Sequence, residues 1–147
     1  MFVVDACLYI KLFINEEYSD TSKDFFNYCF QNDLTVYIPD IFRYEVFHTI
    51  LKNKGDISKV RKMLEMNLSS GFEIFTPDTH TWDIAIEIAQ SWNQKSWYPA
   101  VYDSIYHAFA IQNNYTFISS DMRHITKTSH FWSMLHIKDW AQTKNLC

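Results

Sequence analysis

The sequence has 147 residues, of which 48% are hydrophobic, 18% aromatic and 20% charged, and its formal net charge is −4. This length and apolar content indicate one domain over residues 1–147 with a continuous core, and they exclude a disordered chain. Only two glycines are present, Gly55 and Gly71, which excludes glycine-rich phosphate loops and a nucleophile elbow. The acidic balance also argues against a general basic nucleic-acid-binding protein.

Short apolar runs alternate with longer stretches of helical periodicity along the chain. In chain order, the pattern predicts a strand over 2–4, helices over 6–13 and 22–31, a strand over 35–38, helices over 40–54 and 57–70, a strand over 72–75, helices over 79–93 and 100–112, a strand over 115–118, a short helix after 121, and a strand over 134–137. Such alternation predicts a three-layer α/β/α fold with a parallel sheet of about five strands.

Both glycines lie at predicted helix ends. Gly55 follows the helix over 40–54, and Gly71 follows the next helix, so both are expected to act as helix terminators. Asp56 lies where the N-cap of the second of these helices belongs.

The cysteines and the N-terminal residues bear on the cellular compartment. Cys7, Cys29 and Cys147 are widely separated and form no C-x-x-C pair, a usage that favours a reducing cytoplasm over a disulfide framework or thiolate zinc site. The N-terminal residues have no basic leader, and the longest apolar stretch, residues 2–14, contains two charged residues and is too short to cross a bilayer. We therefore expect a cytoplasmic protein without a membrane segment.

Four carboxylates lie near the predicted carboxyl ends of the strands. Asp5 directly follows the first strand, and Asp121 lies three residues beyond the fourth. Glu45 lies about one turn into the helix that leaves the second strand, and Asp103 about one turn into the helix that follows Pro99. Because ligands bind at the carboxyl edge of a parallel sheet, the four acids are expected to converge on one cleft.

This convergence indicates a divalent cation. Glu45 and Asp103 lie among apolar helical residues, where a carboxylate loses solvation unless a positive group satisfies it. Two like charges about 4 Å apart repel by roughly 4 kcal/mol at an effective dielectric of 20, and no Lys or Arg lies at an obvious position to neutralise all four. An all-oxygen site suits Mg²⁺ or Mn²⁺ rather than zinc. N-cap roles for Asp5 and Asp121, and solvation of the two helical acids, are the alternatives.

Several runs of the sequence together resemble the PIN-domain ribonucleases. They are "FVVDA" at the N-terminus, Glu45 followed by His48 and Ile50, "YDSIYHAFA" over 102–110, and "YTFISSD" over 115–121. Within that family, the length and layout resemble the VapC toxins of prokaryotic toxin–antitoxin pairs, from Phe2 to about Ile137. Cys7 and His48 depart from the residues usual in the family, and the further acid that some members carry after the last Asp is missing.

The resemblance implies a Mg²⁺- or Mn²⁺-dependent endoribonuclease that cleaves RNA phosphodiesters as the toxin of a toxin–antitoxin pair. Asp5, Glu45, Asp103 and Asp121 match the metal-binding and catalytic acids of the family, and Ser119 would support them through its hydroxyl. The implied partners are an RNA substrate, a small antitoxin protein and a second copy of the chain in a homodimer.

Other residues are candidates for RNA contact. Arg43 and His48 share the predicted helix of Glu45, and Arg123 follows Asp121; each could contact the substrate, with an ion pair to a neighbouring acid as the alternative for Arg43. The aromatic residues before Asp103 could stack on bases, although core packing or a dimer contact is the favoured interpretation. They are Trp92, Trp97, Tyr98 and Tyr102.

Two other functional classes are alternatives to the enzyme. A phosphoacceptor receiver domain also places acids at strand ends, but it requires adjacent acids after the first strand, and Asp5 is followed by Ala6. A non-catalytic PIN-like α/β binding module, which uses the acidic cleft for partner contact only, is the main alternative. The acidic total does not exclude RNA, because the four acids equal the whole net charge of −4 and a bound divalent ion would offset it.

Overall fold

The computed structural model describes residues 1–91 and 99–143. Its strands are β1 (Phe2–Val4), β2 (Val36–Pro39), β3 (Phe72–Phe75), β4 (Thr116–Ser119) and β5 (Met134–His136). They form one sheet in the spatial order β3-β2-β1-β4-β5, and every neighbouring pair is parallel. The predicted parallel sheet of about five strands is therefore confirmed.

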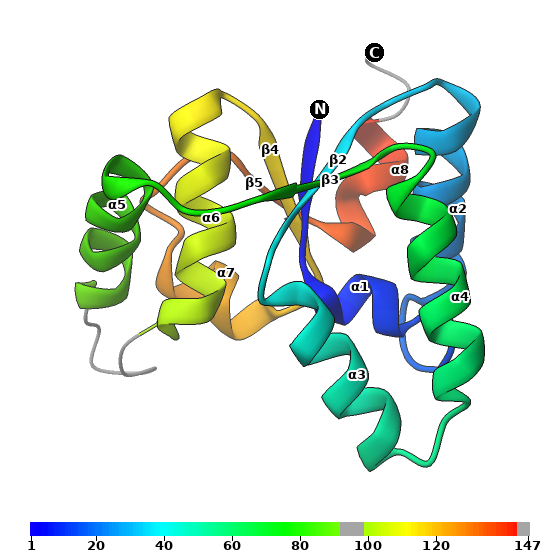
Figure 1. The fold of residues 1–147 in the computed structure, drawn as a ribbon. Helices are drawn as coiled ribbons and strands as arrows, with labels where there is room; N and C mark the ends of the chain where they lie inside the picture. The colour runs from blue at the N-terminus through cyan, green and yellow to red at the C-terminus, as the bar shows by residue number, and fades with distance from the viewer. Residues whose placement is uncertain (92–98, 144–147) are drawn as a thin grey trace.

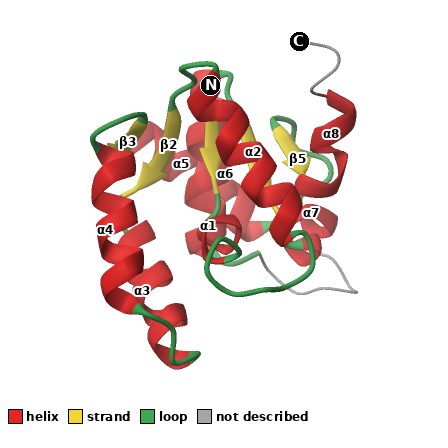
Figure 2. Cartoon of the chain, turned by 90° about the vertical axis from the view of Figure 1, so that its right-hand side faces the viewer, coloured by secondary structure: helices red, strands yellow, loops and turns green. Residues whose placement is uncertain are grey.

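Helices cover both faces of this sheet. They are α1 (Ala6–Ile10), α2 (Ser19–Gln31), α3 (Phe42–Lys52), α4 (Ile57–Leu68), α5 (Thr79–Gln90), α6 (Val101–Asn113), α7 (Met122–Lys127) and α8 (Trp140–Thr143), with a 3₁₀ turn η1 (Ile137–Asp139) before α8. Figures 1 and 2 show α5 and α6 on one side of the sheet and α2, α4 and α8 on the other. The predicted three-layer α/β/α arrangement is confirmed.

The central strands are buried on both faces, which explains their continuous apolar sequences. Val3 and Val4 of β1 and Phe117 and Ile118 of β4 are fully buried. Strand β1 lies between β2 and β4, so the order of the strands reverses at β1. In an open parallel sheet, such a reversal opens a crevice at the carboxyl ends of the strands.

An aromatic cluster holds the helices on the α1 side against the sheet. The Tyr9 ring is fully buried and lies 5.5–5.8 Å, centroid to centroid, from four other phenyl rings. These belong to Phe13, Phe26, Phe42 and Phe72. The Tyr9 hydroxyl accepts a hydrogen bond of 3.0 Å from Asn67 Nδ2 on α4, which satisfies a polar group inside this core.

The ends of several elements differ from the prediction. Helix α2 begins three residues earlier than expected, α1 ends at Ile10, and α5 ends at Gln90. Gly55 does follow α3, but the left-handed residue there is Lys54, with φ of 56°. Gly55 is required for a different reason, because a Cβ at this position would lie 2.9 Å from Ile50 Cγ2.

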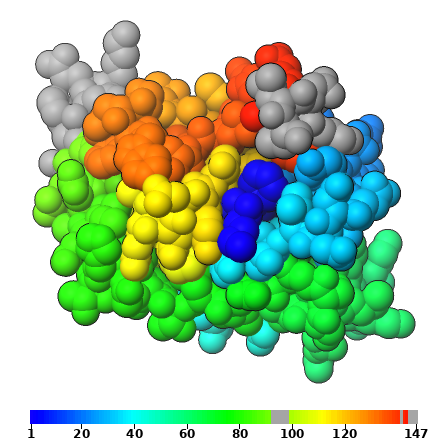
Figure 3. Space-filling view, turned by 90° about the horizontal axis from the view of Figure 1, so that it is seen from above, coloured from blue at the N-terminus to red at the C-terminus, as the bar shows by residue number. Residues whose placement is uncertain are grey.

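The two edges of the sheet differ in character. Figure 3 shows the amino edge, where the start of the chain lies between the segments that lead into β2 and β4. Backbone hydrogen bonds close this edge, from Phe2 N to Thr35 O and from Thr116 N to Met1 O. The candidate acids all lie toward the opposite, carboxyl edge. In the described ranges, no helix combines the length and apolar character needed to cross a bilayer.

Candidate active site

Asp5 and Asp121 begin the helices that follow the two central strands. Asp5 caps α1, and its Oδ1 accepts a hydrogen bond from Cys7 N at 3.0 Å. Asp121 caps α7 in the same way, through Arg123 N at 2.8 Å. The capping interpretation is therefore correct for both acids, but capping uses only one carboxylate oxygen of each. It fixes both side chains at the reversal point of the sheet.

Ser119 connects these two acids. Its hydroxyl is fully buried at the end of β4 and donates a hydrogen bond of 2.6 Å to Asp5 Oδ2. Ser119 Oγ in turn accepts a hydrogen bond of 2.9 Å from Asp121 N. Ser119 therefore orients the Asp5 carboxylate and the backbone that begins the Asp121 turn.

Glu45 reaches the same edge from α3. Its Oε2 accepts a hydrogen bond from the hydroxyl of Tyr106, a fully buried residue of α6. The pKa of Glu45 is raised to about 7, chiefly by burial and to a smaller extent by the negative charge of Asp5, while the hydrogen bond from Tyr106 opposes the rise. Glu45 is therefore expected to exchange its proton near neutral pH. Sequence reasoning missed Tyr106, although it lies three residues after Asp103 in the "YDSIYHAFA" run.

Asp103 is the acid with the fewest compensating contacts. Within the described part of the chain, its carboxylate forms no hydrogen bond or ion pair. Its pKa is raised to about 7, chiefly by burial and also by the negative charges of Asp5, Asp121 and Glu45, whereas Arg123 opposes the rise. The structure thus brings all four acids into one electrostatic environment. Burial also raises the pKa of Asp5, although the hydrogen bond from Ser119 opposes it.

The raised pKa of Asp103 predicts a pH-dependent stability in the protein without divalent ions. On folding, its pKa rises from 3.8 to about 7, so the stability it contributes is fully present below the lower value and is lost as pH rises through the upper one. We therefore expect the stability of the wild type, relative to Asp103→Asn, to fall as pH rises from about 4 to about 8.

Urea denaturation of both proteins in EDTA measures this difference. Taking the difference cancels the opposite contribution of His124, whose pKa burial lowers to about 4. A stability difference that stays constant across the range would contradict the assignment of a raised pKa to Asp103.

Basic groups lie on one side of the acids. Asp103 and Asp121 line a pocket of about 210 Å³ together with Arg123, His124 and Lys127 of α7. The Arg123 side chain is 86% exposed, and its Nε lies 3.5 Å from Asp121 Oδ1. The Arg123 guanidinium is therefore largely exposed to solvent beside the acids.

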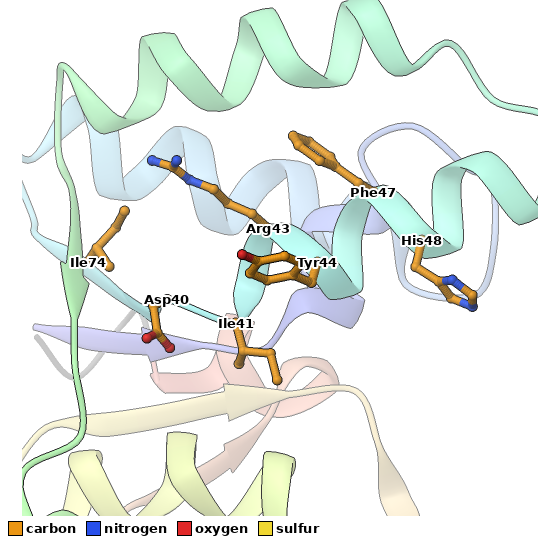
Figure 4. A pocket seen from close by; sticks show the side chains of 7 residues that line it. All are labelled: Asp40, Ile41, Arg43, Tyr44, Phe47, His48 and Ile74. Atoms are coloured by element: carbon orange, nitrogen blue, oxygen red, sulfur yellow. The ribbon is translucent and has the colours of Figure 1, made fainter.

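Arg43 and His48 line a larger pocket on the other side, along α3. This pocket of about 900 Å³ extends to Asp40, Ile41, Tyr44, Phe47 and Ile74. In Figure 4, Arg43 extends from α3 toward the strand that carries Ile74, and Phe47 points toward α4. Arg43 forms no ion pair with any described residue, so the structure does not support the ion-pair interpretation.

Of the four aromatic candidates for base stacking, the structure describes one. Tyr102 is 57% exposed, so the core-packing interpretation is wrong for this residue. Trp92, Trp97 and Tyr98 lie outside the described residues.

Cys7 lies beneath the acids with its Sγ 3.1 Å from Ser120 Oγ, and burial raises the pKa of its thiol, which keeps it neutral.

The chemistry of the cluster fits a hard divalent cation. Its donors are four carboxylates, three of which have raised pKa values, and the donor set contains only oxygen. Among residues 1–91 and 99–143, no three Asp, Glu, His or Cys side chains already stand as a set that could hold a metal ion. Binding of a cation would therefore have to bring the carboxylates closer together than they are in this structure.

A comparison of the sequence with known families decides its affiliation. The profile of the PIN domain matches residues 2–129. This chain belongs to the PIN-domain family. No protein with a curated functional description matches the sequence.

Solved structures share the fold of this PIN domain at low sequence identity. A toxin–antitoxin complex from Klebsiella pneumoniae has a chain that aligns with a TM-score of 0.68 and 15% identity, over 93% of this chain and 98% of that chain. VapBC2 from Rickettsia felis, bound to a DNA fragment from its promoter, aligns with a TM-score of 0.67 and 17% identity, over 92% and 97%.

A third solved structure is a toxin with a stated RNA target. VapC20 from Mycobacterium tuberculosis, a sarcin–ricin loop cleaving toxin, aligns with a TM-score of 0.60 and 12% identity, over 78% of this PIN domain and 84% of its own chain. At these identities, the three likenesses establish the fold.

Proposed function

We propose that this PIN domain is a Mg²⁺- or Mn²⁺-dependent endoribonuclease that cleaves RNA phosphodiesters as the toxin of a cytoplasmic toxin–antitoxin pair. The observation that carries the proposal is the cluster of Asp5, Glu45, Asp103 and Asp121 at the carboxyl edge, where Glu45 and Asp103 have pKa values of about 7. Perturbed carboxyls in a shared cleft are typical of functional sites. The family and the likeness to toxin–antitoxin structures support the same conclusion.

Each acid has a distinct part in this proposal. Asp5, Asp103 and Asp121 would hold the cation, and Glu45 would be a further ligand or orient the attacking water. A bound divalent ion neutralises charge on the phosphoryl oxygens and lowers the pKa of water.

The pair of Glu45 and Tyr106 suits the handling of a proton. The Tyr106 hydroxyl fixes Oε2 of Glu45, which leaves the other carboxylate oxygen to accept the proton of a water that attacks phosphorus. The bond from phosphorus to the leaving ribose oxygen breaks in the same displacement, and that oxygen takes a proton from solvent. In the absence of a divalent ion, the pKa of Glu45 is about 7, and a general base is most effective when its pKa lies near the pH at which the reaction runs. Asp5 is held in place from both sides, by Ser119 and by the backbone of Cys7.

Ser119 should act as a positioning residue for these acids. We expect Ser119→Ala to lower metal affinity and cleavage by about 10- to 100-fold, the effect usual for a group that orients a metal ligand, because Asp5 Oδ2 would lose its 2.6 Å hydrogen bond. Mn²⁺ titrations of binding and of cleavage rate measure both effects. Ser120→Ala is the matched control, since Ser120 Oγ contacts the Cys7 thiol; equal losses in the two variants would contradict the role.

Assays on structured RNAs test the proposed activity. The purified chain is incubated with ribosomal and transfer RNA in Mg²⁺, in Mn²⁺ and in EDTA, and the products are mapped to the nucleotide. Discrete cuts that require the divalent ion support the nuclease. No cutting under any condition would favour the non-catalytic binding module.

The partners that we propose are a small antitoxin and a second copy of the chain. The chains with the same fold from Klebsiella pneumoniae and Rickettsia felis come from toxin–antitoxin assemblies. Mass measurement of the chain alone, and after co-expression with the product of a short neighbouring reading frame, tests both partners.

A further inference from the structure

We propose that a pocket between two exposed tyrosines beside Glu45 binds an unpaired nucleobase of the RNA, next to the phosphodiester that is cut. The tyrosine pocket is formed by Ile41, Tyr44, Glu45 and His48 of α3 and by Tyr102 of α6. The inference rests on the proposed function and adds to it a substrate feature, a nucleotide that is not base-paired at this position.

The tyrosine pocket is continuous with the acid cluster. Glu45 lines the tyrosine pocket and also belongs to the acid cluster. Its charge interacts with those of Asp5 and Asp103. Tyr102 directly precedes Asp103 on α6, so the second wall of the pocket is also next to an acid. A nucleotide in the pocket would therefore place a neighbouring phosphate near the acids.

The exposure of the two tyrosines is the second observation. Tyr44 is 75% exposed and Tyr102 is 57% exposed, although large aromatic side chains normally bury much of their surface. They belong to different helices and line the same pocket of about 430 Å³, a size in the range of small-ligand sites. Exposed aromatic rings are the groups on which single-stranded nucleic acids stack their bases.

The charges around the tyrosine pocket favour RNA over an apolar protein segment. Ile41, Tyr44 and His48 also line the larger pocket of Figure 4, which leads to the exposed Arg43. Beyond the acids, Arg123 lines the pocket of Asp103 and Asp121. Arg43 thus lines a pocket that shares Tyr44 with the tyrosine pocket, and Arg123 lines a pocket that shares Asp103 with the acid cluster; both are groups that bind backbone phosphates.

This arrangement predicts discrimination between single-stranded and duplex RNA. A base can lie against the tyrosine rings that line this pocket only after it has left its own stack, and bases in loops and bulges do so readily. A duplex would keep its contacts to Arg43 and Arg123 but would not fill the tyrosine pocket.

Binding of a labelled RNA tests the inference without depending on cleavage. The probe is a short fluorescein-labelled single-stranded RNA of mixed sequence, measured by anisotropy in Mg²⁺ with Asp103→Asn as the background. We expect Tyr44→Ala and Tyr102→Ala each to weaken binding by about tenfold or more, as loss of one stacked base does. When the same strand is annealed to its complement, both variants should bind the duplex as tightly as the Asp103→Asn protein does.

The controls separate stacking from other effects of the substitutions. Tyr44→Phe and Tyr102→Phe keep the ring and should bind within about twofold of the background. Trp82→Ala removes another exposed aromatic residue, 41% exposed on α5, and should leave binding unchanged. Alanine variants that bind the single strand normally, or phenylalanine variants that lose as much as the alanine ones, would overturn the inference.

Two further outcomes distinguish this inference from the proposed nuclease. If light scattering shows that the Ala variants differ from the wild type in molar mass without RNA, the face that carries the tyrosine pocket is a contact between copies of the chain, and the inference fails. If wild-type protein cuts RNA but the tyrosine variants bind normally, only the tyrosine pocket is refuted. If the tyrosines govern binding but no RNA is cut in Mg²⁺ or Mn²⁺, the nuclease fails and the pocket stands.

Discussion

Replacement of Asp103 by Asn is expected to reduce RNA cleavage by about a thousandfold or more, because a metal ion contributes several kcal/mol of charge stabilisation and each 1.36 kcal/mol is a factor of ten in rate. The charge of Asp103 interacts with those of Asp5, Asp121 and Glu45, and its carboxylate has no hydrogen bond to another described residue, so the charge is available to a cation. The fold should persist, since the substitution removes a half-buried charge and no described contact. Initial cleavage rates in Mn²⁺, with circular dichroism of the same samples, measure both effects.

Asp83→Asn is the matched control for this prediction. Asp83 is exposed on α5, and Figure 1 shows α5 on the opposite side of α6 from α3. The same chemical change there should leave the rate unaltered. Cleavage by Asp103→Asn at a rate near that of the wild type would show that the acid cluster is not the reaction centre.

Divalent ions should raise the melting temperature of the wild type by about 5–10 °C when they are present at a hundred times their dissociation constant. Binding at that level adds about 2.7 kcal/mol, and for a protein of this length each kcal/mol corresponds to about 2–4 °C. The physical source is the relief of repulsion among Asp5, Glu45, Asp103 and Asp121; together with burial, which is the larger cause, this repulsion raises the pKa of Asp103. Thermal denaturation near pH 8 in EDTA, Mg²⁺ and Mn²⁺ measures the shift.

Asp103→Asn should change this response in two ways. Without divalent ions its melting temperature should exceed that of the wild type, because one of the mutually repelling charges is gone. With Mg²⁺ or Mn²⁺ its further rise should be much smaller than that of the wild type. Sodium chloride at matched ionic strength is the control for screening. A wild-type melting temperature that is indifferent to millimolar Mg²⁺ and Mn²⁺ would contradict a shared cation site.

The sheet and the location of the acids were predictable because they depend on chain order and burial alone. Continuous apolar runs such as Phe2–Val4 indicate strands buried on both faces, and the residue that follows such a strand must emerge at the carboxyl edge. Asp5 and Asp121 could be placed by this reasoning. The helix cap at Asp56 was predictable from its position after Gly55, and the structure shows it with a hydrogen bond from Lys59 N.

Contacts that depend on the relative rotation of two helices could not be predicted. The hydrogen bond from Tyr106 to Glu45 joins residues 61 positions apart, on α6 and α3, and helical periodicity fixes the face of a residue but not its partner. The exposure of Tyr102 was missed for the same reason, because an aromatic residue in an apolar helix is usually buried. The left-handed Lys54 carries no sequence signal, since glycine normally takes that position.

A Mn²⁺ titration that records bound ion and cleavage rate together tests the central claim most directly, namely that the acid cluster holds a divalent ion that is required to cut RNA. Bound Mn²⁺ is followed by electron paramagnetic resonance, and cleavage is followed on the RNA that the mapping experiment identifies. We expect the rate and the binding to reach half-saturation at the same Mn²⁺ concentration, and both to be lost in Asp103→Asn. Cleavage that continues unchanged in EDTA, or protein saturated with Mn²⁺ that cuts none of the structured RNAs, would contradict the account.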